Sequence, residues 1–348
     1  MALFSRSGGV GVGIDLGTAN IVVFQSDKGI IYDEPSCVAV RKLPRGAAEI
    51  IAYGHNAKSM IGKTPVGVSV IKPLRDGVIA NFDMTEAVLR HFVTLACQTG
   101  RFSNPQVIVS VPAKVTEVER RAVVDAALGA GAREAYIIDE PLAAALGAGL
   151  PIAAPDGSMV LDIGSGTSEV AVISLGGLVV NNSLRVAGDS MDEAIISLFR
   201  QKHALLIGES TAENVKIEIG SVMPLKKELE IEVKGRDLAD GLPKVSRISS
   251  VEVREALMPI VSRIEDMVKV ALEQTPPELS RDIVDNGIVL TGGASQLRGL
   301  ARKLTGVLNA PVILAEDPIH AVINGVGMTL QNLGAMKTIL TTVHKSQL

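Results

Sequence analysis

The sequence predicts an α/β fold of two domains, and three glycine turns that each follow an apolar run carry this prediction. Two of the runs end in aspartate before the turn, one in each half of the 348 residues. The third run, from 287 to 290, leads into Thr291-Gly292-Gly293-Ala294-Ser295. Because strand-like and helix-like segments alternate between the turns, we expect parallel strands covered by helices. The two aspartate turns read Val12-Gly13-Ile14-Asp15-Leu16-Gly17-Thr18-Ala19-Asn20 and Val160-Leu161-Asp162-Ile163-Gly164-Ser165-Gly166-Thr167-Ser168-Glu169.

Such turns suit a polyphosphate, because glycines expose backbone N–H groups to which a ligand can come close. We expect Asp15 and Asp162 to hold Mg²⁺ through its water shell, since Mg²⁺ gives up water reluctantly. A single Asp-x-Gly could equally be an ordinary hairpin turn, but the pairing of two copies with a third turn favours nucleotide binding. The candidate nucleotide-binding residues in these turns are Asp15, Gly17, Thr18, Ala19, Asn20, Asp162, Gly164, Ser165, Gly166, Gly292, Gly293, Ala294 and Ser295.

In this order, the three motifs resemble the actin, Hsp70 and sugar-kinase superfamily, which has a ribonuclease H-like fold. The resemblance implies an ATPase whose first two turns hold phosphates and whose third contacts adenosine, in a cleft between two domains. Within that superfamily, the chain resembles the MreB family of bacterial shape-determining actins over nearly its whole length. The phrases that carry this resemblance are Asp33-Glu34-Pro35-Ser36, residues 71–80, Asp139-Glu140-Pro141, residues 188–194 and residues 205–209.

Glu140 is the candidate catalytic carboxylate. It precedes Pro141 and an alanine-rich segment, and proline suits the first position of a helix. A carboxylate at a helix start is also stabilised by the helix dipole, by about 0.3–1 kcal/mol, without any catalytic role. The resemblance implies that Glu140 orients the water that attacks the γ-phosphate, assisted by Thr167. Phosphoryl transfer requires little beyond such positioning and charge stabilisation.

Glu213 and Lys216 are further candidates, on a helix that a capping box at Ser210 is expected to open. They lie three residues apart and therefore share one face of that helix. They could form a surface ion pair worth under about 0.5 kcal/mol. The resemblance implies instead that they contact adenine and ribose.

Two features depart from the expected patterns. The second turn has Ser165 where the family usually has a third glycine, and the third turn has Ala294 where a glycine or a serine is common. A serine at positive φ would be strained. The segment that ends in Gly62-Lys63-Thr64 approximates a P-loop, but Pro65 disfavours a helix there, and a P-loop opens a helix. We therefore do not interpret that segment as a phosphate site.

The remaining elements can be placed along the chain. We expect a first domain over residues 1–150 with a strand-rich subdomain at about 30–74, and a second domain over 151–348 with a subdomain at about 186–249. The segment from about 320 is expected to pack back on the first domain. Thr116 should cap a helix that runs to about 129, and residues 226–248 alternate as a hairpin does. The predicted helices are 83–99, 116–129, 188–203, 249–273, which contains Pro259, and 296–304.

Composition fits a cytoplasmic protein with a large core. Apolar residues make up 47% of the chain, and the net charge of −4 gives no basic field for nucleic acid. The two cysteines, Cys37 and Cys97, have no metal-ligand spacing and suggest a reducing compartment.

No apolar run reaches the roughly 18 residues of a membrane span. Because the family lies on the inner face of the cytoplasmic membrane, we expect peripheral contact through Leu3, Phe4 and Phe102, strengthened by many copies along a filament.

The predicted function is that of an ATP-dependent, membrane-associated filament that determines rod shape. ATP or ADP with Mg²⁺ is the expected cofactor, and head-to-tail contacts between copies would build the filament. The resemblance adds paired protofilaments and transmembrane proteins of peptidoglycan elongation as partners. A plasmid-segregating or organelle-aligning actin shares every nucleotide motif and is the main alternative. A sugar kinase is less favoured, and an Hsp70 would need a further domain.

Overall fold

The computed structural model of the chain describes residues 11–43, 48–75, 77–98 and 105–342. It divides into two compact units. Unit 1 comprises Met1–Pro151 together with His320–Leu348, and unit 2 comprises Ile152–Ile319. Each unit has its own central sheet, so each is described by itself.

Unit 1 is built on a six-stranded sheet in the order β19-β10-β9-β1-β2-β3. Strands β1, β9 and β10 are parallel, whereas β2, β3 and β19 pair antiparallel. The parallel arrangement that the strand and helix order predicted is therefore confirmed for β1, β9 and β10. The sheet strands are β1 (Gly11–Leu16), β2 (Asn20–Gln25), β3 (Gly29–Pro35), β9 (Gln106–Val111), β10 (Glu134–Asp139) and β19 (Thr341–Thr342).

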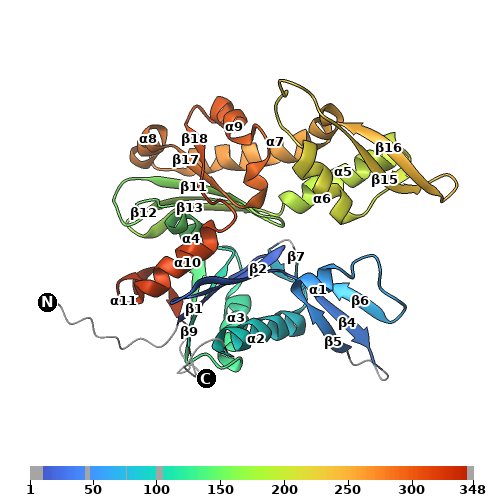
Figure 1. Cartoon of the computed structure of the whole chain (residues 1–348). Coiled ribbons are helices and arrows are strands. Elements are labelled where there is room, and N and C mark those ends of the chain that lie inside the picture. The colour runs from blue at the N-terminus through green and yellow to red at the C-terminus, as the bar shows by residue number, and fades with distance from the viewer. Residues whose placement is uncertain (1–10, 44–47, 76, 99–104, 343–348) are drawn as a thin grey trace. The chain divides into compact units, whose positions relative to one another are not determined.

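Helices cover both faces of this sheet, α2 and α3 on one side and α4 and α10 on the other (Figure 1). Helix α3 begins with the predicted capping box, in which Thr116 and Glu119 satisfy each other's backbone N–H groups. The helices are α2 (Phe82–Gln98), α3 (Glu117–Gly129), α4 (Glu140–Gly147), α10 (Ala321–Gln331), α11 (Leu333–Met336) and η3 (Lys337–Ile339). The smaller part comprises β4 (Val38–Lys42), β5 (Ala48–Tyr53), α1 (Gly54–Lys58), β6 (Val68–Ile71), β7 (Leu74–Arg75) and β8 (Val78–Ile79).

Helices α4 and α10 cross with glycines at their contact. A Cβ on Gly147 would overlap the carbonyl oxygen of Ala321, and one on Gly325 would overlap that of Ala143. The two backbones therefore touch directly, which larger side chains would prevent. This crossing attaches the C-terminal segment to the helix that begins with Glu140.

Unit 2 is built on a five-stranded sheet in the order β13-β12-β11-β17-β18. Strands β11, β17 and β18 are parallel, and β12 and β13 are antiparallel to their neighbours. The sheet strands are β11 (Ser158–Ile163), β12 (Ser168–Ser174), β13 (Gly177–Leu184), β17 (Ile288–Thr291) and β18 (Val312–Leu314). A smaller sheet comprises β14 (Leu205–Leu206), β15 (Glu230–Asp237) and β16 (Pro243–Ser249). The helices are α5 (Gly188–Lys202), α6 (Glu209–Ile219), α7 (Ser250–Gln274), α8 (Pro277–Asn286), η2 (Gly293–Gln296) and α9 (Leu300–Leu308).

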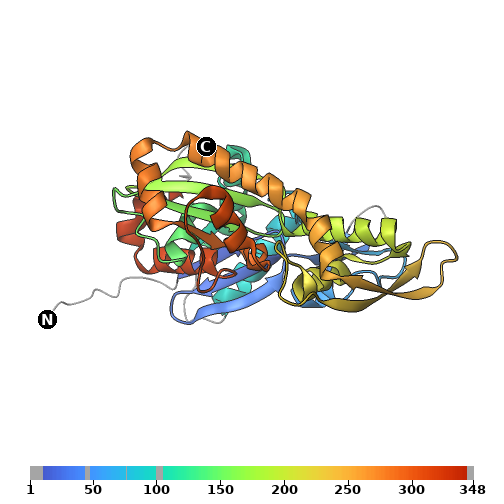
Figure 2. The same ribbon diagram turned by 90° about the horizontal axis from the view of Figure 1, so that it is seen from above.

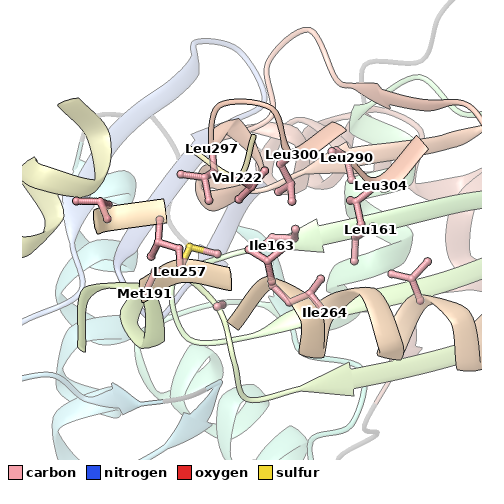
Figure 3. Close-up of a cluster of buried hydrophobic side chains, with 14 of the residues drawn as sticks. Leu161, Ile163, Met191, Val222, Leu257, Ile264, Leu290, Leu297, Leu300 and Leu304 are labelled. Carbon is pink, nitrogen blue, oxygen red and sulfur yellow. The ribbon is translucent and has the colours of Figure 1, made fainter. Parts of the chain in front are cut away.

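Helix α7 organises the core of unit 2. It extends from the strands of the main sheet toward the β15–β16 hairpin (Figure 2). Its buried side chains recur at helical spacing, as the sequence predicted, and Pro259 lies inside the helix without ending it. Leu257 and Ile264 pack with Leu161 and Ile163 of β11 in one apolar cluster (Figure 3). This cluster holds β11, and with it Asp162, in a fixed position.

Two local predictions were wrong. A helix over 296–304 was expected, but the chain forms the short helix η2, then a turn with Gly299 at φ 84°, and only then α9. A left-handed residue cannot continue a helix, and glycine adopts that conformation readily. The capping box at Ser210 was also wrong, because α6 begins at Glu209 and its N-cap is Gly208, two residues before Ser210.

We predict that Gly147→Ala destabilises unit 1. The added methyl group must displace the Ala321 carbonyl, and overpacking costs about 1–3 kcal/mol. Thermal unfolding followed by circular dichroism should show a melting temperature lower by about 2–4 °C for each kcal/mol lost from the free energy of unfolding.

Gly334→Ala is the matched control, because a Cβ there meets no atom within 4 Å. This variant should melt at or slightly above the wild-type temperature. Equal melting of wild-type protein and Gly147→Ala would mean that the α4–α10 crossing tolerates a wider separation.

Candidate functional site

The first turn is anchored by a hydrogen bond between two parallel strands. Asp15 near the end of β1 lies in register with Ser110 of β9. The Ser110 hydroxyl donates to Asp15 Oδ1 at 2.7 Å. This bond fixes the direction of the carboxylate at the point where β1 gives way to the glycine turn.

The second turn repeats this geometry in unit 2. Asp162 on β11 lies in register with Thr291 of the parallel strand β17, and the Thr291 hydroxyl donates to Asp162 Oδ1 at 2.7 Å. Asp162 is only 7% exposed. Burial raises the pKa of its carboxyl group, and the Thr291 hydrogen bond partly offsets that rise. A hydrated cation beside Asp162 would stabilise the ionised form, so the carboxylate suits the predicted Mg²⁺ role.

The residues of the first turn make specific backbone contacts. A Cβ on Gly17 would approach the carbonyl oxygen of Asn20 to 2.7 Å, so the turn closes tightly around a residue without a side chain. The Thr18 hydroxyl is buried and accepts a hydrogen bond from the Gly77 N–H at 3.2 Å. The Asn20 amide donates to Asp33, and Ala19 is exposed. The turn is thereby tied to the segment after β7 and to strand β3.

The second turn closes in a similar way and does not strain Ser165. The Gly164 N–H donates to the Thr167 carbonyl at 2.9 Å. Ser165 is not among the described residues with positive φ, so a glycine is not required there. Its carbonyl accepts a hydrogen bond from the Asp189 N–H at the start of α5, and Gly166 is buried. The Ser165 hydroxyl is buried and has no hydrogen-bond partner within the described part of the chain.

The third turn packs directly against strand β11. Gly292 has φ 83°, and a Cβ there would overlap the carbonyl oxygen of Ile163. Gly293, by contrast, has open space around it. The Ser295 hydroxyl donates to the Gly292 carbonyl at 2.6 Å, and Ala294 lies between them in η2. The structure therefore brings Asp162, the second turn and the third turn together at one edge of the unit 2 sheet.

Glu140 begins helix α4 directly after the buried strand β10 and is only 8% exposed. Asp139, the N-cap of α4, makes no side-chain cap hydrogen bond. Its Oδ1 instead accepts a hydrogen bond from the Arg120 guanidinium at 2.6 Å. Glu140 and Asp15 belong to unit 1, whereas Thr167 belongs to unit 2.

Lys216 makes its contacts within unit 2. Its ammonium group lies 2.9 Å from the Asp192 carboxylate and 3.1 Å from the Gly188 carbonyl oxygen. Burial raises the pKa of Asp192 to about 6, and Lys216 opposes that rise. Glu213 adds a negative charge nearby that raises the same pKa slightly. Helix α6 thus presents Lys216 to Gly188 at the start of α5, and Gly188 in turn lies against Ser165.

Sequence reasoning missed four polar residues: Ser110, Thr291, Arg120 and Asp192. Ser110 interrupts an apolar strand, which was a usable signal. The three residues predicted to contact the membrane, Leu3, Phe4 and Phe102, lie outside the described residues. Within the described residues, no helix has the length and apolarity needed to cross a bilayer.

We predict that Asp162→Ala weakens binding of Mg-ADP. The variant loses a buried carboxylate whose interactions with charged groups are each worth about 1.5–3 kcal/mol, so affinity should fall by about tenfold or more. Isothermal titration calorimetry with Mg-ADP measures this change. Asp156→Ala, at an exposed position of unit 2, is the control and should bind as the wild type does. An unchanged affinity for Asp162→Ala would remove the second turn from the site.

Comparisons with known proteins identify the family and the fold. The model of the MreB/Mbl protein family matches residues 9–338. The cell shape-determining protein MreB of Escherichia coli is 49% identical over 320 residues, which cover 91% of this chain and 92% of that protein. The cell shape-determining protein Mbl of Bacillus subtilis is 44% identical over 322 residues, covering 92% and 96%.

Solved structures give the same result. The crystal structure of MreB5 of Spiroplasma citri bound to ADP superposes with a TM-score of 0.89 at 37% identity. It covers 95% of this chain, which in turn covers 98% of it. The same protein bound to AMPPNP gives a TM-score of 0.89 at 36% identity. These matches confirm the predicted actin-like, two-domain α/β fold, and the chain belongs to the MreB/Mbl family of bacterial actins.

Proposed function

We propose that this protein is an ATPase that assembles into membrane-associated, actin-like filaments and determines rod shape by organising peptidoglycan elongation. The observation that carries the proposal is the duplicated aspartate–hydroxyl pair, Asp15–Ser110 and Asp162–Thr291, each beside a glycine turn. The relatives named above are cell shape-determining proteins, and the S. citri relative binds ADP and AMPPNP. These findings support the shape-determining role and the binding of an adenine nucleotide.

The nucleotide would be held by turns from both units. We propose two actin-like domains, residues 1–150 and 151–348, with subdomains at about 30–74 and 186–249 and a C-terminal segment from about 320 that belongs with the first domain. Backbone N–H groups of the first two turns would bind phosphate oxygens. The Ser165 hydroxyl, which has no hydrogen-bond partner among the described residues, is suited to donate to one of these oxygens. The open space at Gly293 would admit the adenosine, with Glu213 and Lys216 beside it.

Mg²⁺, when bound, would neutralise phosphate charge, and Asp15 and Asp162 are the residues that would hold it through water. In hydrolysis, the oxygen of a water molecule bonds to the γ-phosphorus while the bond from that phosphorus to the bridging oxygen breaks. The products are ADP and inorganic phosphate, and the water's proton is released to the phosphate or to solvent. Glu140 would orient this water, and Thr167 would assist with its hydroxyl.

Filament assembly follows from coupling of the nucleotide to domain closure. A ligand that binds both domains favours the closed arrangement and so shifts the population toward it. Head-to-tail contacts of closed copies do not form a ring and therefore give a filament. Paired protofilaments, the inner face of the cytoplasmic membrane and transmembrane elongation proteins are the proposed partners.

We expect the purified protein to sediment as filaments with Mg-ATP, and to sediment less with Mg-ADP or without nucleotide. High-speed centrifugation with electron microscopy of the pellets makes this measurement. Protein that hydrolyses ATP yet stays in the supernatant in all three conditions would contradict the filament proposal and favour a phosphotransferase.

Glu140→Gln should slow phosphate release by about tenfold or more, because a positioned acid or base typically raises the reaction rate by about 10²–10⁴-fold. The affinity for Mg-ADP should stay within about twofold of wild type. Release is followed with a phosphate-binding assay. Glu278→Gln, at an exposed position of α8, is the control. Wild-type release rates for Glu140→Gln would take Glu140 out of catalysis.

Membrane contact can be tested by flotation with anionic phospholipid vesicles. Removal of residues 2–4 together with Phe102→Ser should reduce the floating fraction, because the apolar contacts are lost and avidity along a filament amplifies the loss. Phe82→Ser is the matched control, since Phe82 is 46% exposed on α2. Equal flotation of wild type and the combined variant would place membrane contact elsewhere.

A further inference from the structure

Arg120 is a buried cation that contacts the junction between β10 and α4. It lies on α3, and its side chain is 9% exposed. Its guanidinium donates to Asp139 Oδ1 at 2.6 Å and to the Ala113 carbonyl oxygen at 3.1 Å. A buried charge is tolerated when it is paired and hydrogen bonded in this way. One side chain thus connects three segments: α3, the turn after β9 and the junction of β10 with α4.

The junction held by Arg120 is the one that presents Glu140. Asp139 is the last residue of β10, in register with Val111 of β9, and it is the N-cap of α4. An aspartate at an N-cap commonly accepts a hydrogen bond from the first turn of its helix. Here no such bond forms, and the Asp139 carboxylate is directed to Arg120 instead. The next residue is the buried Glu140, and Pro141 restricts the backbone after it.

The backbone around Glu140 is therefore fixed from two directions. The β9–β10 ladder holds Asp139 from the sheet, and Arg120 holds the same residue from α3. Without the Arg120 bond, the Asp139 carboxylate would be free to cap α4, and the first turn of that helix would shift. A displacement of about 1 Å from a productive geometry can cost about 10²-fold in rate.

We propose that Arg120 is a positioning residue for ATP hydrolysis, acting through Asp139 on the direction of the Glu140 carboxylate. This inference rests on the proposed role of Glu140. The guanidinium itself touches neither the nucleotide nor the reacting atoms in this account. Its effect should therefore appear in the rate of hydrolysis and not in nucleotide affinity.

The test is a double-mutant cycle on the full-length protein. Arg120→Met, Glu140→Gln and the combined variant are compared for single-turnover phosphate release and, by calorimetry, for Mg-ADP affinity. We expect Arg120→Met to release phosphate about 10–100-fold more slowly and to bind Mg-ADP within about threefold of wild type. The combined variant should be no slower than Glu140→Gln alone, because Arg120 acts only through Glu140.

Two further variants keep the proposal testable if Arg120→Met does not fold. Arg120→Lys retains the charge but loses the geometry of the guanidinium, and Asp139→Asn retains an accepting oxygen but loses the charge. Both should remain folded and hydrolyse ATP more slowly than wild type. Arg121→Met, the exposed neighbour on α3, is the control and should hydrolyse normally.

The outcomes separate this inference from the proposed function. Additive losses in the combined variant, or wild-type hydrolysis by folded Arg120 variants, would overturn the positioning role and leave Glu140 in place. Wild-type hydrolysis by Glu140→Gln would overturn the role of Glu140, and the Arg120 proposal with it. A matched loss of nucleotide affinity and rate in Arg120→Lys would show that Arg120 has only a structural role.

Discussion

The structure depends on one interaction that occurs in both units, a hydrogen bond from a hydroxyl on one parallel strand to an aspartate on the next. Ser110 donates to Asp15 in unit 1 and Thr291 donates to Asp162 in unit 2, both at 2.7 Å. A carboxylate in a buried sheet is costly unless it is hydrogen bonded, and the neighbouring strand provides the donor. Because the donor and acceptor are in register, the pairing of the strands fixes the carboxylate direction. The glycine turns, the third turn at Gly292 and the apolar cluster around β11 all contribute to holding these sheet edges in place.

The sheet edges also explain where the other functional candidates lie. Parallel strands end at the same edge, so β9, β10 and β1 bring the turn after β9, Asp139 and Asp15 to one side of unit 1. Glu140 follows at the first position of α4, and Arg120 connects this region to α3. In unit 2, Gly292 follows Thr291 directly, so one strand provides both the donor to Asp162 and the third turn. A short sequence segment therefore contains several residues of the proposed site.

The sequence alone predicted the fold class and the turns, because glycine spacing and apolar runs are local properties. It did not reveal Ser110 or Thr291 as partners of the aspartates, since their roles depend on strand register between segments far apart in the chain. Arg120 was missed because its bond to Asp139, 19 residues along the chain, depends on how α3 packs beside the end of β10. The strain anticipated at Ser165 is not present, because no positive φ is needed there. The break before α9 depends on Gly299, whose conformation the helical periodicity could not reveal.

We propose that the two aspartate turns, one in each unit, serve a single nucleotide site. A calorimetric titration with Mg-ADP that counts sites, repeated for Asp15→Asn and Asp162→Asn, tests it most directly. We expect one ADP per chain in the wild type and a weaker affinity at that same site in both variants. Two independent sites per chain, or an affinity that only one of the two variants changes, would contradict it.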